Sequence, residues 1–184
     1  LTEGTIEVTD DLILIGNGAN KSIIDGNDDG RALYVNDANI TLRIEDLTLS
    51  RGGLQITPGD LIVRRSRFTG AVQNSFFGGA VFADNLIDIR DTVFDNNQAV
   101  DGAAVWGNPQ SHGVFENVTV TGNRGGGLAL RGTHYTLNQL TITGNTGGVF
   151  VAEGGALNLL ETATANITGS IVAGNYSIGG STNC

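Results

Sequence analysis

The sequence predicts an all-β chain that folds as a parallel β-helix, a single-stranded solenoid of about seven coils. Three observations predict this fold. A motif of the form apolar-x-x-Asn recurs along the 184 residues. Short runs alternate between apolar and polar residues, which is typical of strands, and no segment has a convincing helical period. Glycine, of which there are 28, and asparagine occupy the expected turns between these runs.

The repeat is clearest in five segments that carry the asparagine. They read IDGN from Ile24, FDNN from Phe94, VTGN from Val120, ITGN from Ile142 and VAGN from Val172. Degenerate copies begin at Leu49 and Phe68, where Gly52 and Ala71 take the asparagine position. The apolar anchors are about 25 residues apart, a length that suits one coil of a β-helix and does not suit a leucine-rich repeat or a propeller blade.

Stacking the repeats places apolar residues in four columns, which we expect to point into the interior. The first column is Leu33, Leu54, Ala80, Ala104, Leu128 and Val149. The second is Val35, Ile56, Phe82, Trp106, Leu130 and Val151. The third is Ile44, Val63, Ile89, Phe115, Leu137 and Ile167, and the fourth is Leu49, Phe68, Phe94, Val120, Ile142 and Val172. Phe68 is therefore expected to lie against Phe94, and Phe82 against Trp106.

Two corners of each coil are marked by particular residue types. Small residues begin the first strand, where a Cβ would crowd the corner or φ must be positive: Ala32, Gly53, Gly79, Ala103, Gly127 and Gly148. Asparagines close the last strand, and stacked coils would bring their amides into a hydrogen-bonded structural ladder. The members of this predicted ladder are Asn97, Asn123, Asn145 and Asn175.

Composition indicates one domain spanning residues 1–184, since 40 % of the residues are hydrophobic and the chain is long enough for a sizeable core. The sequence contains no methionine, so we expect it to be part of a longer or assembled surface structure. The net charge is −9, and Lys21 is the single lysine. An acidic chain without a basic stripe argues against nucleic acid as a partner. No apolar run approaches the ~18 residues of a membrane span, so we expect no membrane insertion.

Two motifs carry a family resemblance. Gly78 to Val81 and Phe94 to Asn97 resemble the GGA(I/L/V) and FxxN repeats of the polymorphic outer-membrane proteins and related autotransporter-like bacterial surface proteins. The entry segment from Gly4 to Gly26 is similar to the first coil of large secreted β-helix proteins. The resemblance implies a right-handed parallel β-helix exported to the cell surface as part of an adhesin. Its motifs are structural, and it implies no catalytic residue.

One column of the predicted coils carries charge. It holds Glu45 with Asp46, Arg64 with Arg65, Arg90 with Asp91, and Glu116 with Asn117. Polysaccharide-cleaving enzymes of this architecture need clustered carboxylates, or calcium with an arginine base, and a cleft with Arg65 or Arg90 beside Asp91 would supply them. Acids and bases face each other at several steps, however, which favours a ladder of opposite charges between coils. We therefore predict no catalytic residue.

A short acidic segment is the one candidate metal site. Asp25, Asn27 and Asp29 match the start of a calcium loop, D-x-[DN]-x-[DN]-G. The twelfth position of such a loop would be Asn36 where a glutamate is needed, and the segment lies between strands where a calcium loop lies between helices. We expect a polar turn here, with no metal and no cofactor.

The outward positions of the first strand form a candidate docking face that is apolar and poor in charge. In successive coils they are Tyr34, Gln55, Val81, Val105, Ala129 and Phe150, of which Tyr34, Val81, Val105 and Phe150 are the strongest. Either a loop or flanking sequence covers this face, or another chain or a glycan docks on it.

The function that the sequence favours is that of a non-enzymatic extracellular or cell-surface module with a structural or adhesive role. Its expected partners are further copies of itself, in head-to-tail or lateral association that can build a fibre, or a surface glycan or protein. The alternative is a polysaccharide lyase or glycoside hydrolase of the pectate-lyase-like β-helix type. Assays on acidic and neutral polysaccharides separate the two.

Overall fold

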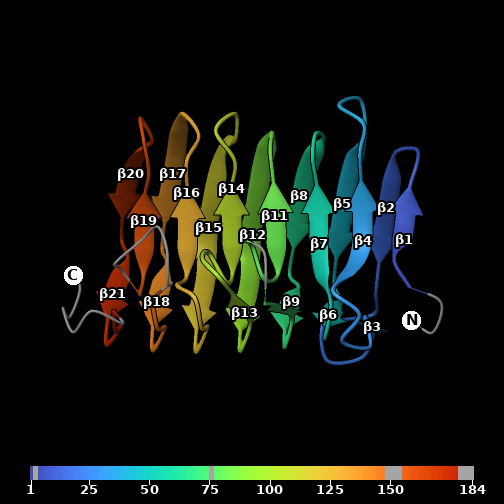
Figure 1. Ribbon diagram of the computed structural model, residues 1–184, viewed down its shortest axis with the longest axis horizontal. Coiled ribbons are helices and arrows are strands. Elements are labelled where there is room, and N and C mark those ends of the chain that lie inside the picture. Colours follow the sequence, from blue (N-terminus) through green and yellow to red (C-terminus); the bar gives the residue numbers. More distant parts are fainter. Residues whose placement is uncertain (2–3, 75–76, 148–154, 178–184) are drawn as a thin grey trace.

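The computed structural model describes residues 1, 4–74, 77–147 and 155–177. All regular structure in this part of the chain is β-strand, and the paired strands are parallel. They stack as a β-solenoid of about six turns, close to the seven predicted. The turns follow one another along the long axis of the molecule, from the blue N-terminal turn to the red C-terminal turn (Figure 1). The described residues include no helix long and apolar enough to cross a membrane.

Turns are numbered so that the first spans residues 12–35, the second 41–56, the third 60–83 and the fourth 86–107. Each turn ends with one strand of sheet A, consecutive turns supply neighbouring strands, and one further strand precedes the first turn. The strands of sheet A are β1 (Ile6–Val8), β4 (Arg31–Val35), β7 (Gly53–Ile56), β11 (Val81–Ala83), β14 (Val105–Gly107), β16 (Leu128–Leu130) and β19 (Leu157–Leu159).

Sheet B faces sheet A across the core and bends within each turn. Its first arm contains β2 (Leu12–Ile15), β5 (Thr41–Glu45), β8 (Asp60–Arg64), β17 (His134–Asn138) and β20 (Thr164–Thr168). Its second arm contains β3 (Ile23–Asp25), β6 (Thr48–Ser50), β9 (Arg67–Thr69), β18 (Thr141–Thr143) and β21 (Ile171–Ala173). The long strands β12 (Leu86–Asp95) and β15 (His112–Thr121) run through both arms.

A third side of the solenoid is short. It consists of β10 (Val72–Gln73) paired with β13 (Gln98–Ala99), and isolated bridges continue it through Arg124, Thr146 and Tyr176. The second turn has no strand on this side, because only Arg51 and Gly52 separate β6 from β7. This corner is tight: a Cβ on Gly52 would lie 2.8 Å from Gly26 Cα.

The two core columns predicted on sheet B are confirmed. Residues aligned from Ile44 to Ile167 pair in register from turn to turn. The same holds for the column from Leu49 to Val172. Phe68 and Phe94 stack as expected, with ring centroids 5.0 Å apart and planes inclined by 18°.

The predicted register of sheet A is wrong by one residue in two turns. Val81 pairs with Leu54 and with Val105, so these valines occupy the first inward column in place of Ala80 and Ala104. Both valines are fully buried in the hydrophobic core. The small residues that precede the inward column are correspondingly Gly53, Ala80, Ala104, Gly127 and Ala156.

The same shift moves two aromatic residues out of the core. Phe82 and Trp106 do pair with each other, but in line with Gln55 on the outer side of sheet A. The second inward column holds Ala83 and Gly107 at these turns. The interior has room only for small residues there, because a Cβ on Gly107 would lie 2.8 Å from the hydroxyl of the buried Tyr135.

The last members predicted for sheet A, namely Gly148, Val149 and Val151, lie outside the described residues. Their expected places in the two inward columns are taken by Leu157 and Leu159, which pair with Leu128 and Leu130.

Two columns of left-handed residues explain the bends of each turn. The bend of sheet B has φ between 46° and 56° at Asp46, Arg65, Asp91, Asn117 and Gln139. The second column lies directly before the ladder asparagines, at Asn96, Gly122, Gly144 and Gly174, with φ between 55° and 66°. Because glycine and asparagine adopt this region at the lowest cost, the repeats end in Gly-Asn or Asn-Asn.

Candidate functional site

The structure brings the four asparagines of the predicted ladder together inside one corner of the solenoid. The Oδ1 of Asn123 accepts two hydrogen bonds from Asn97, one from the backbone N–H at 3.0 Å and one from the side-chain Nδ2 at 2.9 Å. In the same way, the Oδ1 of Asn145 accepts both hydrogen bonds from Asn123, and the Oδ1 of Asn175 accepts both from Asn145. Each of the four side chains is at most 2 % exposed. Their amides satisfy buried backbone groups, so their role in this structure is structural.

The charged column on sheet B is a network of ion pairs. Glu45, Arg64, Arg90 and Glu116 lie in register in successive turns. Arg65 contacts Glu45 and Asp46, each at 2.8 Å, and Arg64 and Arg90 both bind Asp88, which the sequence had not indicated. Arg90 also contacts Glu116 at 2.7 Å.

The proposed carbohydrate cleft in this column does not form around Asp91. Its Oδ1 accepts from Asn117 Nδ2 at 2.7 Å, while Arg65 and Arg90 bind other carboxylates. Hydrogen bonds from Arg65 hold the pKa of the Asp46 carboxyl below its usual value. A general acid at neutral pH needs a raised pKa, so this carboxyl is unsuited to that role.

The candidate calcium segment is a turn closed by an arginine. Arg51 binds the carboxylates of Asp25 and Asp28. The Oδ1 of Asp25 also accepts the backbone N–H of Asn27 at 2.9 Å. The hydrogen bond from Arg51 lowers the pKa of Asp25. Arg51 thus pairs with two of the acids of this segment, and the described residues contain no group of three or more His, Cys, Asp or Glu side chains that could hold a metal ion.

The candidate docking face has a different composition from the one predicted. Val81 and Val105 point into the core, Phe150 lies outside the described residues, and Tyr34 remains on the outer side. The residues that align with Tyr34 on this outer face, one in each later turn, are Gln55, Phe82, Trp106, Ala129 and Asn158.

Part of this outer face is covered by the chain itself. Trp106 is only 1 % exposed, because the ring of Phe77 stacks on it with the centroids 4.1 Å apart. The guanidinium of Arg131 lies 5.6 Å from the centroid of the Trp106 ring, and Arg131 also pairs with Glu161. The cover does not extend to Gln55 and Phe82, beside which a pocket opens.

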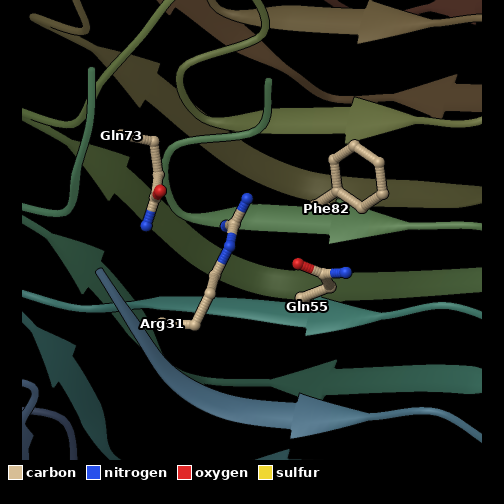
Figure 2. A pocket seen from close by; sticks show the side chains of 4 residues that line it. All are labelled: Arg31, Gln55, Gln73 and Phe82. Atoms are coloured by element: carbon tan, nitrogen blue, oxygen red, sulfur yellow. The ribbon is translucent and has the colours of Figure 1, made fainter. Parts of the chain in front are cut away.

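That pocket has a volume of about 220 Å³ and is lined by Arg31, Gln55, Gln73 and Phe82. The four residues come from β4, β7, β10 and β11, and therefore from neighbouring turns. Their side chains converge on one space at the side of sheet A (Figure 2). The space exists because the second turn has no strand on the third side of the solenoid, so β10 faces the start of β4 across the two-residue corner.

Arg31 reaches over the second turn to the third. Its Nη1 donates to Gly78 O at 2.6 Å, and its Nη2 donates to Phe77 O at 2.9 Å. Weaker contacts join Nη1 to the carbonyls of Leu54 and Gly79. The side chain can cross only because position 53 is glycine, since a Cβ there would lie 2.7 Å from Nη1.

Arg31 differs in its charge environment from the arginines of the charged column. Among the described residues it forms no ion pair and binds only neutral carbonyl oxygens, whereas the arginines of the charged column bind carboxylates. Desolvation by burial lowers the pKa of Arg31 to about 10, so the side chain is still a cation at neutral pH. A partly buried cation without a counter-ion among the described residues attracts an anion.

Gln73 adds an unused donor to the same pocket. Its side chain is 7 % exposed, and its Nε2 has no hydrogen-bond partner in the described part of the chain. Buried polar groups in folded proteins are nearly always bonded, so an unpartnered amide that lines a pocket points to a ligand or solvent molecule in that pocket.

The sequence did not indicate this pocket. It appears only when Arg31, Gln73 and the loop that ends at Gly79 are brought together by the coiling of the chain. The available signal was the isolation of Arg31, a lone arginine at the start of an apolar strand, RALYV, with no acid in the equivalent places of later turns.

No protein-family model matches the chain, and no curated protein or solved structure is significantly similar to it.

Proposed function

We propose that this chain is a non-enzymatic structural and adhesive module of an extracellular or cell-surface protein. The observation that carries the proposal is the pairing of the charged column, in which the acids and bases that could serve catalysis bind one another. A general acid or base must be free to exchange a proton with substrate. Burial raises the pKa of the Asp101 carboxyl to about 6, but this side chain is fully buried and has no access to a polymer chain.

The surface location rests on the resemblance of Gly78 to Val81 and Phe94 to Asn97 to the repeats of polymorphic outer-membrane proteins. A solenoid suits such a location, since its length grows with each turn and its side faces stay available to partners. Fractionation of the producing cells, followed by detection of the chain with an antibody, tests this part of the proposal. Recovery in the cytoplasmic fraction alone would contradict it.

We expect end-to-end association of the solenoid with further copies. The inward columns end in residues that are more exposed than their equivalents one turn away: Leu159 is 39 % and Ile167 48 % exposed, while Leu130 and Leu137 are fully buried. At the other end Ile6 is 41 % exposed. A second copy stacked in register would cover these side chains and pair the strand edges.

Two measurements test the proposed function. The purified chain, incubated with a panel of acidic and neutral polysaccharides, should release no unsaturated product and no new reducing ends. Release that an active-site substitution abolishes would establish the lyase or hydrolase alternative. Light scattering over a concentration series should show growth of the particle mass, which Ile167→Lys reduces. A monodisperse monomer at high concentration would rule out self-association.

A further inference from the structure

The Arg31 pocket contains donors that the protein itself does not use. A guanidinium carries five N–H groups. Nη1 is engaged by three carbonyl oxygens and Nη2 by one, so a hydrogen on Nη2 and the hydrogen on Nε have no acceptor among the described residues. Gln73, whose Nε2 is buried and unpartnered, lines the same space, and Figure 2 shows its amide beside the guanidinium of Arg31.

These donors suit a carboxylate. A carboxylate has two oxygens in one plane and accepts parallel N–H groups from a guanidinium, with further lone pairs for an amide donor. The anion would supply the missing counter-charge of Arg31 and the missing acceptor of Gln73 together. The pocket offers one arginine, where a doubly charged group such as a phosphate ester is commonly met by several cations.

The remaining walls suit a sugar ring. The ring of Phe82 lies beside the charge, with the Arg31 Cζ 5.8 Å from its centroid, and offers an apolar surface. The amide of Gln55, whose Nε2 donates to Thr57 Oγ1 at 3.2 Å, adds a polar group of the kind that binds hydroxyls. A space of about 220 Å³ is below the usual size of pockets for drug-sized ligands, so it suits a small group.

We propose that this pocket binds the carboxylate of a single acidic sugar residue, a uronate, with Arg31 and Gln73 as its donors and Phe82 as the platform for the ring. The inference rests on the proposed function, because it names the ligand class of the adhesive module. The net charge of −9 disfavours polymers with a carboxylate on every residue and favours neutral glycans with isolated uronates.

The test is a titration of the ¹⁵N-labelled chain followed by NMR, with glucuronate as the probe and glucuronamide as its uncharged counterpart. A single small sugar should bind in about the millimolar range. We expect glucuronate to shift the side-chain amide signals of Gln55 and Gln73, and glucuronamide to bind at least about tenfold more weakly. If glucuronate and glucuronamide bind equally tightly, the pocket does not recognise the carboxylate. If N-acetylglycine binds as tightly as glucuronate, the pocket does not recognise the sugar ring.

Two substitutions locate the binding. Gln73→Leu removes the unpartnered N–H, so the fold should be retained while the affinity for glucuronate falls at least about fivefold. Gln98→Leu, on the paired strand β13, is the matched control and should leave the affinity unchanged. Arg31→Gln should abolish detectable binding. Unchanged affinity in Gln73→Leu would overturn the proposal even if Arg31→Gln fails to fold.

The outcome is separable from that of the proposed function. Binding of glucuronate together with cleavage of an oligouronide would overturn the non-enzymatic proposal and leave the ligand class standing. Absence of binding, with no cleavage and with retained self-association, would overturn only the ligand class.

Discussion

Replacing Asn123 with leucine tests the ladder that closes one corner of every later turn. The Asn123 amide makes five hydrogen bonds. Its Oδ1 accepts from the backbone N–H and the Nδ2 of Asn97, and its Nδ2 donates to Phe94 O at 3.1 Å, Thr121 O at 3.2 Å and Asn145 Oδ1 at 2.8 Å. Leucine has a similar size but can replace none of these bonds.

The expected loss follows from what the substitution leaves unpaired. The backbone N–H of Asn97 lies in a corner where that residue is 1 % exposed, and a stranded buried donor costs about 1–3 kcal/mol. The broken amide–amide and amide–carbonyl bonds cost about 1 kcal/mol each, and the apolar side chain recovers part of this sum. We expect Asn123→Leu to lower the free energy of unfolding by about 3 kcal/mol, or the Tm by about 6–12 °C.

Urea unfolding followed by fluorescence is a suitable assay, because Trp106 is the single tryptophan and is buried. The matched control is Asn166→Leu, which makes the same change on the exposed side of β20 and should alter stability by less than about 0.5 kcal/mol. If the two variants unfold at the same urea concentration, the ladder does not stabilise the corner and the reasoning is refuted.

Three further predictions concern the core and the buried carboxyls. Phe94→Ala removes the ring that stacks on Phe68 and should cost about 3–5 kcal/mol by urea unfolding; a loss below about 1 kcal/mol would contradict the packing. Burial raises the pKa of Asp101 from 3.8 to about 6, so the folded state binds the extra proton and stability falls as pH rises through that window. Asp101→Asn should therefore stabilise by about 2–3 kcal/mol at pH 7 and not at pH 3.5, and an equal effect at both pH values would refute the assignment. Burial acts to raise the pKa values of Asp88 and Asp95, but hydrogen bonds from arginines outweigh it and hold both below 3.8. In the Asp101→Asn background, stability should therefore fall as pH drops through the folded pKa values of Asp88 and Asp95. A flat profile down to pH 2 would exclude these ion pairs as a source of stability.

The sequence by itself determined the repeat, the coil length, the all-β class and the register of sheet B. These follow from local rules, since alternation at period two defines the faces of a strand. The Gly-Asn or Asn-Asn end of the four later motifs specifies a left-handed residue before an inward amide, whereas in the first motif Asn27 is itself left-handed and exposed. The ladder from Asn97 to Asn175 could be predicted because each asparagine lies at the same position of the repeat motif in its own turn.

The tertiary structure alone decided the register of sheet A at the third and fourth turns. Gly79 and Ala80 are both small enough for the corner, and either frame buries apolar residues, so the pattern could not choose between Val81 and Phe82. The choice depends on volume: the hydroxyl of the buried Tyr135 lies so close to Gly107 that the core has space there only for a small residue.

The pocket was likewise decided by tertiary structure. Among the described residues Arg31 has no acid beside it, and its side chain crosses a glycine to carbonyls two turns away. Gln73 lies beside it only because the second turn is short on its third side. Such a site depends on the lengths of loops in three successive turns, and its electrostatics come from burial. Neither property is carried by the residue types at any one position of the chain.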